Sequence, residues 1–484
     1  MTSPGARARG GRALAPAVLA AVLLMAACDG SKKEPAAPPA TGASARRPNV
    51  LLIVLDTTRA DRCSFLGYGR PTTPYLEELA RSGTAYTNCW SPSSWTGPAH
   101  ASLFTGLRPE NHGYLRDNRP FLDASAETLA ERFKAAGYAT CGVSNNPNVG
   151  RGNALDQGFD TWHDLWRGER RPVVHSDAPG GGYGLPEELE VVSFPPSSKG
   201  HGIAAEWARE RHAKKEPFFL FVNDMEPHLP YEPAEDVQAR FVREGTDAAE
   251  VTWARLFRFP VFVGHNFGLY RVRDDRIALL GDLYDAEIAT LDRQLRTFVE
   301  GLREGGVLDD TVVVVVGDHG ENLGEHGLLD HQLSLHRTLL HVPLLVVAPG
   351  HVAAGARVED LVRVEDVAPT LLEIAGLTQP VRADGRSLLH DVPGRRTWAA
   401  LDRMTDFQVQ EVRALFPQAE IGRALVGLRS YADADLHYVR AHDGREELYD
   451  LRADPREDHD LAPAGGDLLD RARRALEEVH PRRR

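Results

Sequence analysis

The stretch that determines the fold is TVVVVVGDHG at residues 311–320. Its consecutive valines are β-branched and lack the polar alternation of a half-exposed strand. Such a run is typical of a strand buried on both faces of a parallel sheet. The run stops at Gly317, and Asp318 and His319 follow it directly. The stretch therefore predicts a buried strand with a carboxylate and an imidazole at its carboxyl end.

Three further apolar runs extend this pattern outward: NVLLIVL at 49–55, FFLFV at 218–222 and LLVV at 344–347. Helical patterns lie between them, as at 74–83 and 282–302, and strands that alternate with helices indicate a doubly wound α/β sheet. Ligands of such sheets bind at the carboxyl ends of the strands. Asp56 and His228 follow the first two runs. We expect both to lie near Asp318 and His319.

Residues 96–106, TGPAHASLFTG, form another candidate element of this site. Pro98 is a preferred first helical residue and Gly106 a preferred C-terminal cap, so a helix is predicted between them. Thr96 then lies at a helix N-terminus, where free amides favour an anion. The alternative is that Thr96 only caps the helix.

Length and charge restrict the class of protein. The chain has 484 residues, 42% of them hydrophobic, and a formal net charge of −13. Its acidity, with no basic tract in the folded body, makes nucleic acid an improbable partner. No lysine follows Lys215.

The N-terminus predicts export. An apolar stretch at 13–27 follows Arg7, Arg9 and Arg12. It is shorter than a typical transmembrane helix and has the length and flanking charge of a secretory signal. The run LLMAAC at 23–28 is similar to a bacterial lipobox, which makes Cys28 the predicted lipidation site and 1–28 a lipoprotein signal peptide. Residues 29–47 would be a flexible linker to a cell-envelope membrane. The alternative is a plain signal with an incidental cysteine.

From Pro48 to about Leu461 the chain resembles sulfatases of the alkaline phosphatase superfamily. The matching segments include NVLLIVLDTTRAD at 49–61, TGPAHASLFTGLRPENHG at 96–113, PFFLFVNDMEPHLPY at 217–231 and VVGDHGENLGEHG at 315–327. The resemblance implies an alkaline-phosphatase-like, mostly parallel sheet between helices, with a small C-terminal antiparallel α+β subdomain. It implies a hydrolase with at least one divalent ion (Ca, Mn, Zn or Mg) held by Asp56, Thr96, Asp318 and His319. Thr96 matches the nucleophile.

The chain departs from the family at several positions. Formylglycine needs Cys or Ser followed by x-Pro-x-Arg, whereas this chain has Thr96 and His100, so no formylglycine is expected. Thr57 replaces the second acid of the usual Asp-Asp pair. No lysine lies where family sulfatases contact sulfate, and His331 or His326 occupies that region. We therefore expect phosphate or phosphonate esters to be favoured over sulfate esters. A formylglycine-independent sulfatase, a phospho-group transferase and a non-catalytic lipoprotein scaffold are the alternatives.

The remaining site residues follow from the resemblance. His228 is expected to contact the leaving group or the anion, and His100 and His331 are further catalytic candidates. Asn223 and His326 are candidates for binding the substrate, which is expected to be an anionic ester of the glycan- or lipid-derived kind. Asp224 and His228, with His331 as third ligand, have the spacing that phosphodiesterase relatives use for a second zinc site, and Glu226 is the alternative to Asp224.

The predicted domains are a catalytic domain at 48–377, a C-terminal subdomain at 378–465 and an exposed charged helix or tail at 466–484. Two insertions, a loop at about 166–200 and an aromatic-rich segment at about 234–270, are expected to set substrate choice. The aromatic residues of the second insertion form either a lid over the cleft or the core of a small cap.

Overall fold

A computed structural model describes residues 47–115, 121–166, 170–174, 188–192, 195–257, 259–379, 382–391 and 393–479. The described residues all belong to one compact unit, which begins at Arg47. The predicted signal peptide, Cys28 and nearly all of the linker lie outside the described residues. Within the described ranges, no helix combines the length and apolarity needed to cross a membrane.

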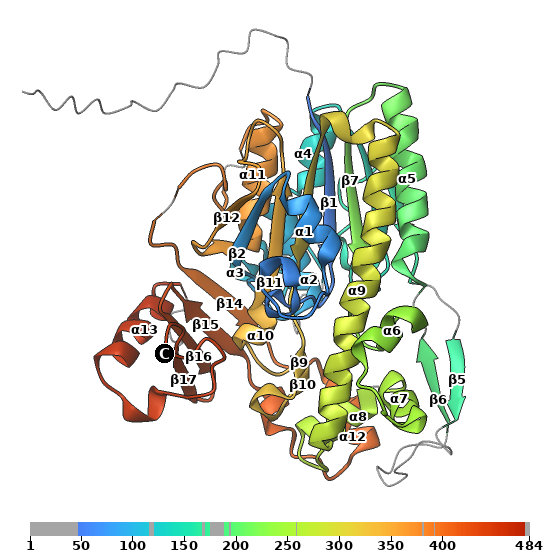
Figure 1. Ribbon diagram of the computed structural model, residues 1–484. Coiled ribbons are helices and arrows are strands. Elements are labelled where there is room, and N and C mark those ends of the chain that lie inside the picture. Colours follow the sequence, from blue (N-terminus) through green and yellow to red (C-terminus); the bar gives the residue numbers. More distant parts are fainter. Residues whose placement is uncertain are drawn as a thin grey trace, which may run out of the picture. The chain divides into compact units, whose positions relative to one another are not determined.

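The core of the unit is one large mixed sheet (Figure 1). The strand order is β12-β2-β11-β8-β1-β7-β3-β4, and β13 also pairs with β2. Five neighbouring strands are parallel: β8 (Thr311–Gly317), β1 (Asn49–Leu55), β7 (Phe218–Asp224), β3 (Ala139–Ser144) and β4 (Thr161–Asp164). The predicted mostly parallel α/β sheet is confirmed.

The fourth apolar run is the exception to the parallel arrangement. It forms β11 (His341–Val347), which is antiparallel to both β8 and β2 (Thr84–Trp90). Its carboxyl end therefore points away from the edge where β1 and β8 end. The short strands β12 (Ala356–Val358) and β13 (Val362–Arg363) are parallel to β2.

Helices cover both faces of the sheet, which explains the unbroken apolar runs. Leu51, Ile53 and Leu55 of β1 pack in one core, and Val50 and Val54 pack in the other. Both kinds of position are fully buried because each face of the strand is covered. The first face carries α1 (Pro74–Ala80), α5 (Ser197–Ala213) and α9 (Asp274–Glu304); the second carries α2 (Thr96–Thr105), α4 (Leu129–Ala135) and α11 (Val367–Ile374).

The C-terminal region forms the expected separate antiparallel sheet. Its strands are β14 (Thr397–Leu401), β15 (Leu428–Ala432), β16 (Leu436–Ala441) and β17 (Glu446–Asp450), paired in that order. Helix α13 (Asp467–Glu477) packs against this sheet, with Leu469 and Leu476 buried beside Tyr438. The segment predicted as an exposed charged helix or tail is therefore a helix with one buried face.

The two insertions differ in structure. In the first, where a loop was expected, β5 (Arg170–Val174) and β6 (Glu188–Val192) form an antiparallel pair. The second contains α6 (Glu235–Phe241), α7 (Ala248–Arg255) and α8 (Phe259–Asn266). Its Trp253, Phe257 and Phe262 are buried in one core with residues of α9 and of α12 (Asp406–Leu415). These aromatic residues pack a core, which favours the second of the two expected arrangements.

Candidate active site

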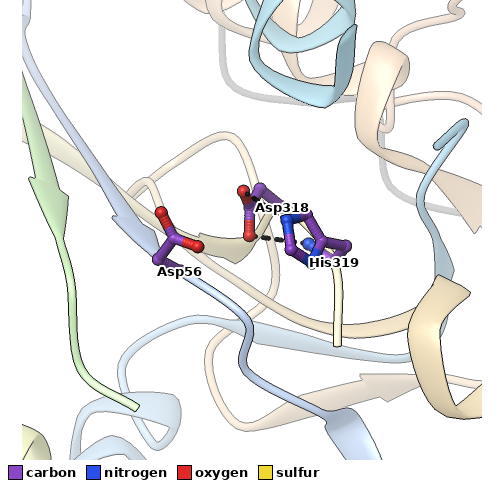
Figure 2. A group of neighbouring side chains, drawn as sticks. All are labelled: Asp56, Asp318 and His319. Atoms are coloured by element: carbon purple, nitrogen blue, oxygen red, sulfur yellow. Dashed lines mark hydrogen bonds and ion pairs between the residues drawn. The ribbon is translucent and has the colours of Figure 1, made fainter. Parts of the chain in front are cut away.

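Three metal-ligating side chains meet at the carboxyl edge of the parallel strands. Asp56 follows β1 and Asp318 and His319 follow β8, and these strands pair in register with Leu55 opposite Gly317. One ligand atom of each of the three side chains lies within 4.8 Å of the others. Figure 2 shows them converging from the ends of the two strands. The sequence-based expectation for this trio agrees with its placement.

The carboxylates of this trio are held so that one oxygen of each remains free. Asp318 Oδ1 accepts hydrogen bonds from the Thr57 amide (3.1 Å) and from the His319 amide (2.7 Å). Asp56 Oδ2 accepts one from Asn146 Nδ2 at 2.6 Å. Asp56 Oδ1 and Asp318 Oδ2 are buried and accept no hydrogen bond from the described residues. Two uncompensated buried oxygens beside an imidazole fit a divalent cation, which would supply the missing partner.

The backbone at Thr57 supports this arrangement at some cost. Thr57 has φ +50°, a left-handed conformation that a β-branched residue rarely adopts. This conformation accompanies the amide contact to Asp318, and the Thr57 carbonyl accepts a hydrogen bond from Tyr284 Oη at 2.6 Å. Thr57 therefore contributes its backbone to the site.

Electrostatics and hydrogen bonding prepare His319 as a ligand. Burial and the neighbouring His331 hold the pKa of His319 well below its usual value, so its ring is neutral. His319 Nδ1 lies 3.1 Å from the Gly320 carbonyl, which can only accept, so Nδ1 carries the proton. The Nε2 lone pair is left free. Burial and the charge of Asp56 raise the pKa of Asp318, because two carboxylates without a cation repel each other.

Thr96 lies against this trio. Its Oγ1 is 3.1 Å from His319 Nε2, and the side chain is buried. Thr96 is the first residue of α2, and Trp95 occupies the N-cap position without a side-chain cap bond. The helix thus begins two residues before Pro98, where it was predicted to begin, and Gly106 ends it as expected with φ +69°. Since Thr96 makes no capping bond, its hydroxyl is available for other chemistry.

His100 and Asn223 line the same site from α2 and β7. His100 Nδ1 donates to the Thr96 carbonyl at 2.9 Å and lies 3.5 Å from Asp318 Oδ2. Burial lowers the pKa of His100, so this ring is not a fixed positive charge. Asn223 Nδ2 lies 3.4 Å from His100 Nε2 and 3.5 Å from Asp56 Oδ2.

His228 and His331 form a further wall of the site. Their ring centroids are 5.3 Å apart, and that of His331 is 4.6 Å from that of His319. His228 Nδ1 donates to the Leu229 carbonyl at 2.6 Å, which leaves Nε2 as the free ring nitrogen. Burial lowers the pKa of His228.

The structure does not bring together two sets of predicted site residues: His326 with the rest of the site, and the three ligands of the second zinc site. His326 stacks on His336 with centroids 3.5 Å apart and lines a cavity of about 850 Å³ beside His265, Arg271 and Arg456. The described contacts place none of the other site residues against it. Asp224 Oδ1 lies 2.9 Å from His201 Nε2, and neither of the two metal-ligating clusters found among the described residues includes Asp224 or His228. The expected second zinc site of Asp224, His228 and His331 is therefore not assembled.

Three residues of the site were missed by the sequence analysis. Asn146 follows β3, whose sequence ATCGVS is too mixed to stand out as a buried strand. Glu321 and Asp330 belong to the segment between His319 and His331, and each has a carboxylate oxygen 3.2 Å from His331 Nδ1. These two carboxylates approach His331 only through the pairing of two short strands within this segment, which no pattern in the sequence indicates.

Comparisons with known proteins agree with this geometry. Residues 48–377 match the family described as Sulfatase, and residues 324–468 match the family described as N-sulphoglucosamine sulphohydrolase, C-terminal. The chain is 28% identical to the multifunctional alkaline phosphatase superfamily protein PehA of Trinickia caryophylli, over 89% of this chain and 95% of that protein. It is 24% identical to a sulfatase of Formosa agariphila, over 85% and 82% of the two chains.

Among solved structures, the phosphonate monoester hydrolase of Agrobacterium radiobacter has a similar fold. The TM-score is 0.68 at 24% identity, covering 90% of this chain and 95% of that one. The fold and the site define a hydrolase of the alkaline phosphatase superfamily. More specifically, the chain belongs to the sulfatase family.

Proposed function

We propose that this protein is a metal-dependent ester hydrolase in which Thr96 is the nucleophile, with phosphate or phosphonate esters as preferred substrates. The observation that carries the proposal is the 3.1 Å contact between Thr96 Oγ1 and His319 Nε2, next to the free oxygens of Asp56 and Asp318. A threonine hydroxyl is a weak nucleophile unless a base or a cation activates it. The groups that could hold such a cation, which are His319 Nε2 and the free oxygens of Asp56 and Asp318, meet next to Thr96.

A divalent cation held by Asp56, Asp318, His319 and Thr96 would supply positive charge that favours the ionised threonine. Thr96 Oγ would then form a bond to phosphorus or sulfur while the bond to the leaving oxygen breaks. His228, whose free Nε2 can accept the proton that Thr96 loses, would pass that proton to the departing oxygen, with His331 beside it. In a second step water would attack the phosphorus or sulfur of the ester on Thr96, which breaks its bond to Thr96 Oγ1 and regenerates the hydroxyl.

The preference for phospho-esters rests on the charges around Thr96. His100 stands where the formylglycine signature has arginine, and its lowered pKa makes it neutral. Arg59 is buried near the site, but its guanidinium is bound to Asp61 and Glu325. The relative PehA is named a multifunctional alkaline phosphatase superfamily protein, which is a reason to test more than one class of ester. The match of residues 324–468 to a sulphohydrolase family favours the second candidate, a formylglycine-independent sulfuric ester hydrolase.

A substrate panel tests this proposal. Aryl phosphate monoesters, aryl phosphate diesters, aryl phosphonates and aryl sulfates would be assayed with the metal-stripped protein supplemented in turn with Mn²⁺, Zn²⁺, Ca²⁺ and Mg²⁺. We expect diesters or phosphonates to be turned over much faster than sulfates. Arylsulfatase activity without phospho-ester activity would establish the second candidate, and a protein inactive on every substrate with every metal would refute both.

We also propose that the protein is exported and anchored through lipid on Cys28, as the lipobox-like run predicts. The Cys28→Ala variant should appear in the soluble fraction with its turnover unchanged, because Asp56, Asp318 and His319 of the site all belong to the unit that begins at Arg47. Fractionation of cells followed by immunoblotting measures this. Membrane association that persists in the variant would rule out the lipid anchor.

A further inference from the structure

A second cluster of metal-ligating groups lies beside the first. Glu321, Asp330 and His331 are buried, and one ligand atom of each lies within 4.8 Å of the others. They come from the two ends of one hairpin, β9 (Asn322–Leu323) paired with β10 (Leu329–Asp330). The register of this hairpin, with Asp330 opposite Asn322, brings Glu321 next to His331.

The donor atoms of this cluster lie close to the same ring nitrogen. His331 Nδ1 lies 3.2 Å from Glu321 Oε1 and 3.2 Å from Asp330 Oδ1. A neutral imidazole carries at most one proton on Nδ1, and that proton can serve only one carboxylate well. A cation can be shared by both carboxylates and the ring nitrogen at once.

Glu321 provides the independent evidence for a missing ligand. Its side chain is fully buried, and its Oε2 accepts no hydrogen bond from the described residues. Arg59 binds the Glu321 main-chain carbonyl at 3.0 Å, but its guanidinium neutralises Asp61 and Glu325 instead of the Glu321 carboxylate. A buried carboxylate oxygen without a partner is costly, whereas a coordinated cation would stabilise it.

We propose that Glu321, Asp330 and His331 bind a second divalent cation beside the Asp56–Asp318–His319 site. Two carboxylates and one imidazole suit Zn²⁺ or Mn²⁺, and three protein ligands leave a position open to water or substrate. The cation gives positive charge to a wall of the site that otherwise presents carboxylates to an anionic ester. Only the role of this cation toward an anionic ester rests on the proposed function. The assignment of Glu321, Asp330 and His331 as ligands rests on their distances and burial.

Metal content of the full chain tests the second site without any assay of turnover. The protein would be stripped with EDTA, reloaded with excess Zn²⁺, passed through gel filtration and analysed by inductively coupled plasma mass spectrometry. We expect two equivalents in the wild type and one in Glu321→Gln. We also expect one in Asp318→Asn and none in the double variant. Glu325→Gln is the matched control on the same hairpin, because its carboxylate binds Arg59, and it should keep two equivalents.

The measured metal stoichiometry decides whether the second site exists. A wild-type protein that saturates at one equivalent, or a Glu321→Gln variant that keeps two, would overturn the proposal. If Glu321→Gln does not fold, as judged by circular dichroism, Asp330→Asn replaces it with the same expectation, and the wild-type stoichiometry decides the matter in any case. One equivalent with normal turnover would refute the second site alone, whereas two equivalents without turnover on any ester would refute the proposed function alone.

Discussion

At the scale of single residues, the site is defined by atoms that lack partners. Asp56 Oδ1 and Asp318 Oδ2 are buried and accept no hydrogen bond from the described part of the chain. The other oxygen of each carboxylate is held by amide groups of Asn146, Thr57 and His319. The protein thus fixes the direction of both free oxygens before any ligand arrives, which is the property expected of a metal site.

The first prediction concerns Asp318. Asp318→Asn keeps the shape of the side chain but replaces a carboxylate by an amide, a much weaker ligand. We expect one equivalent of divalent metal to be lost and turnover to fall by at least about 10²-fold, as the loss of one strong electrostatic contribution to a transition state would predict. Metal analysis and kinetics on the same preparation check this. Full activity in a metal-free Asp318→Asn protein would contradict the account.

At the scale of elements, the helix α2 positions the nucleophile. Gly97, directly after Thr96, lies so close to Tyr114 that an added Cβ would be 2.2 Å from the tyrosine oxygen. The tyrosine is itself buried and bound to Asn153 Nδ2 at 2.7 Å, so it has little freedom to move. The first turn of α2 therefore requires glycine at position 97 because of space.

The second prediction follows from this close approach. Gly97→Ala should displace the start of α2 and lower turnover strongly, with a loss of stability of about 1–3 kcal/mol typical of overpacking. Gly202→Ala is the control, since Gly202 is exposed in α5 with no atom within 4 Å of the added Cβ. It should keep full turnover and gain up to about 1 kcal/mol. Denaturant unfolding and kinetics measure both, and equal behaviour of the two variants would argue against a role of α2 geometry.

The central strands could be predicted from sequence because a strand that is buried on both faces consists almost entirely of apolar residues. After their first residues, Asn49 and Thr311, β1 and β8 contain no polar side chain, and the polar residues that follow these strands are those of the site. Strand direction could not be predicted in the same way. β11 has an apolar run like its neighbours, but it is antiparallel to β8. Burial on two faces determines the composition of a strand and not its direction, so the sequence shows no sign of this difference. The second acidic cluster depends on the register of a two-residue hairpin, which no periodicity reveals.

At the scale of the whole molecule, buried charge links metal binding to stability. Burial raises the pKa of Glu321 from its usual value to about 8 and that of Asp318 in the same direction. A carboxyl whose pKa is raised in the folded state stabilises the fold while it is protonated and loses that contribution as the pH rises through the folded pKa. The metal-free protein should therefore become less stable from about pH 5 to pH 8, while the bound cation removes this penalty.

The third prediction is a pH-dependent effect of chelation. EDTA should lower the melting temperature little at about pH 5 and considerably more at about pH 8, because protons compete with the cation for the same carboxylates. A cation at 100 times its Kd stabilises a fold by about 2.7 kcal/mol, which sets the scale of the change. Differential scanning fluorimetry at both pH values measures it. A chelation effect of equal size at the two pH values would be inconsistent with metal binding by buried carboxylates of raised pKa.

The most direct test of the account is to trap the covalent intermediate on Thr96. Wild-type protein would be mixed with an aryl phosphodiester or phosphonate, quenched in acid within one turnover and analysed by peptide mass spectrometry. The account predicts that the peptide containing Thr96 carries the phosphoryl or phosphonyl part of the substrate. It also predicts that Thr96→Ser still reacts and that Thr96→Ala neither reacts nor turns over. Turnover by Thr96→Ala at the wild-type rate, with Thr96 unmodified in the wild-type protein, would contradict it.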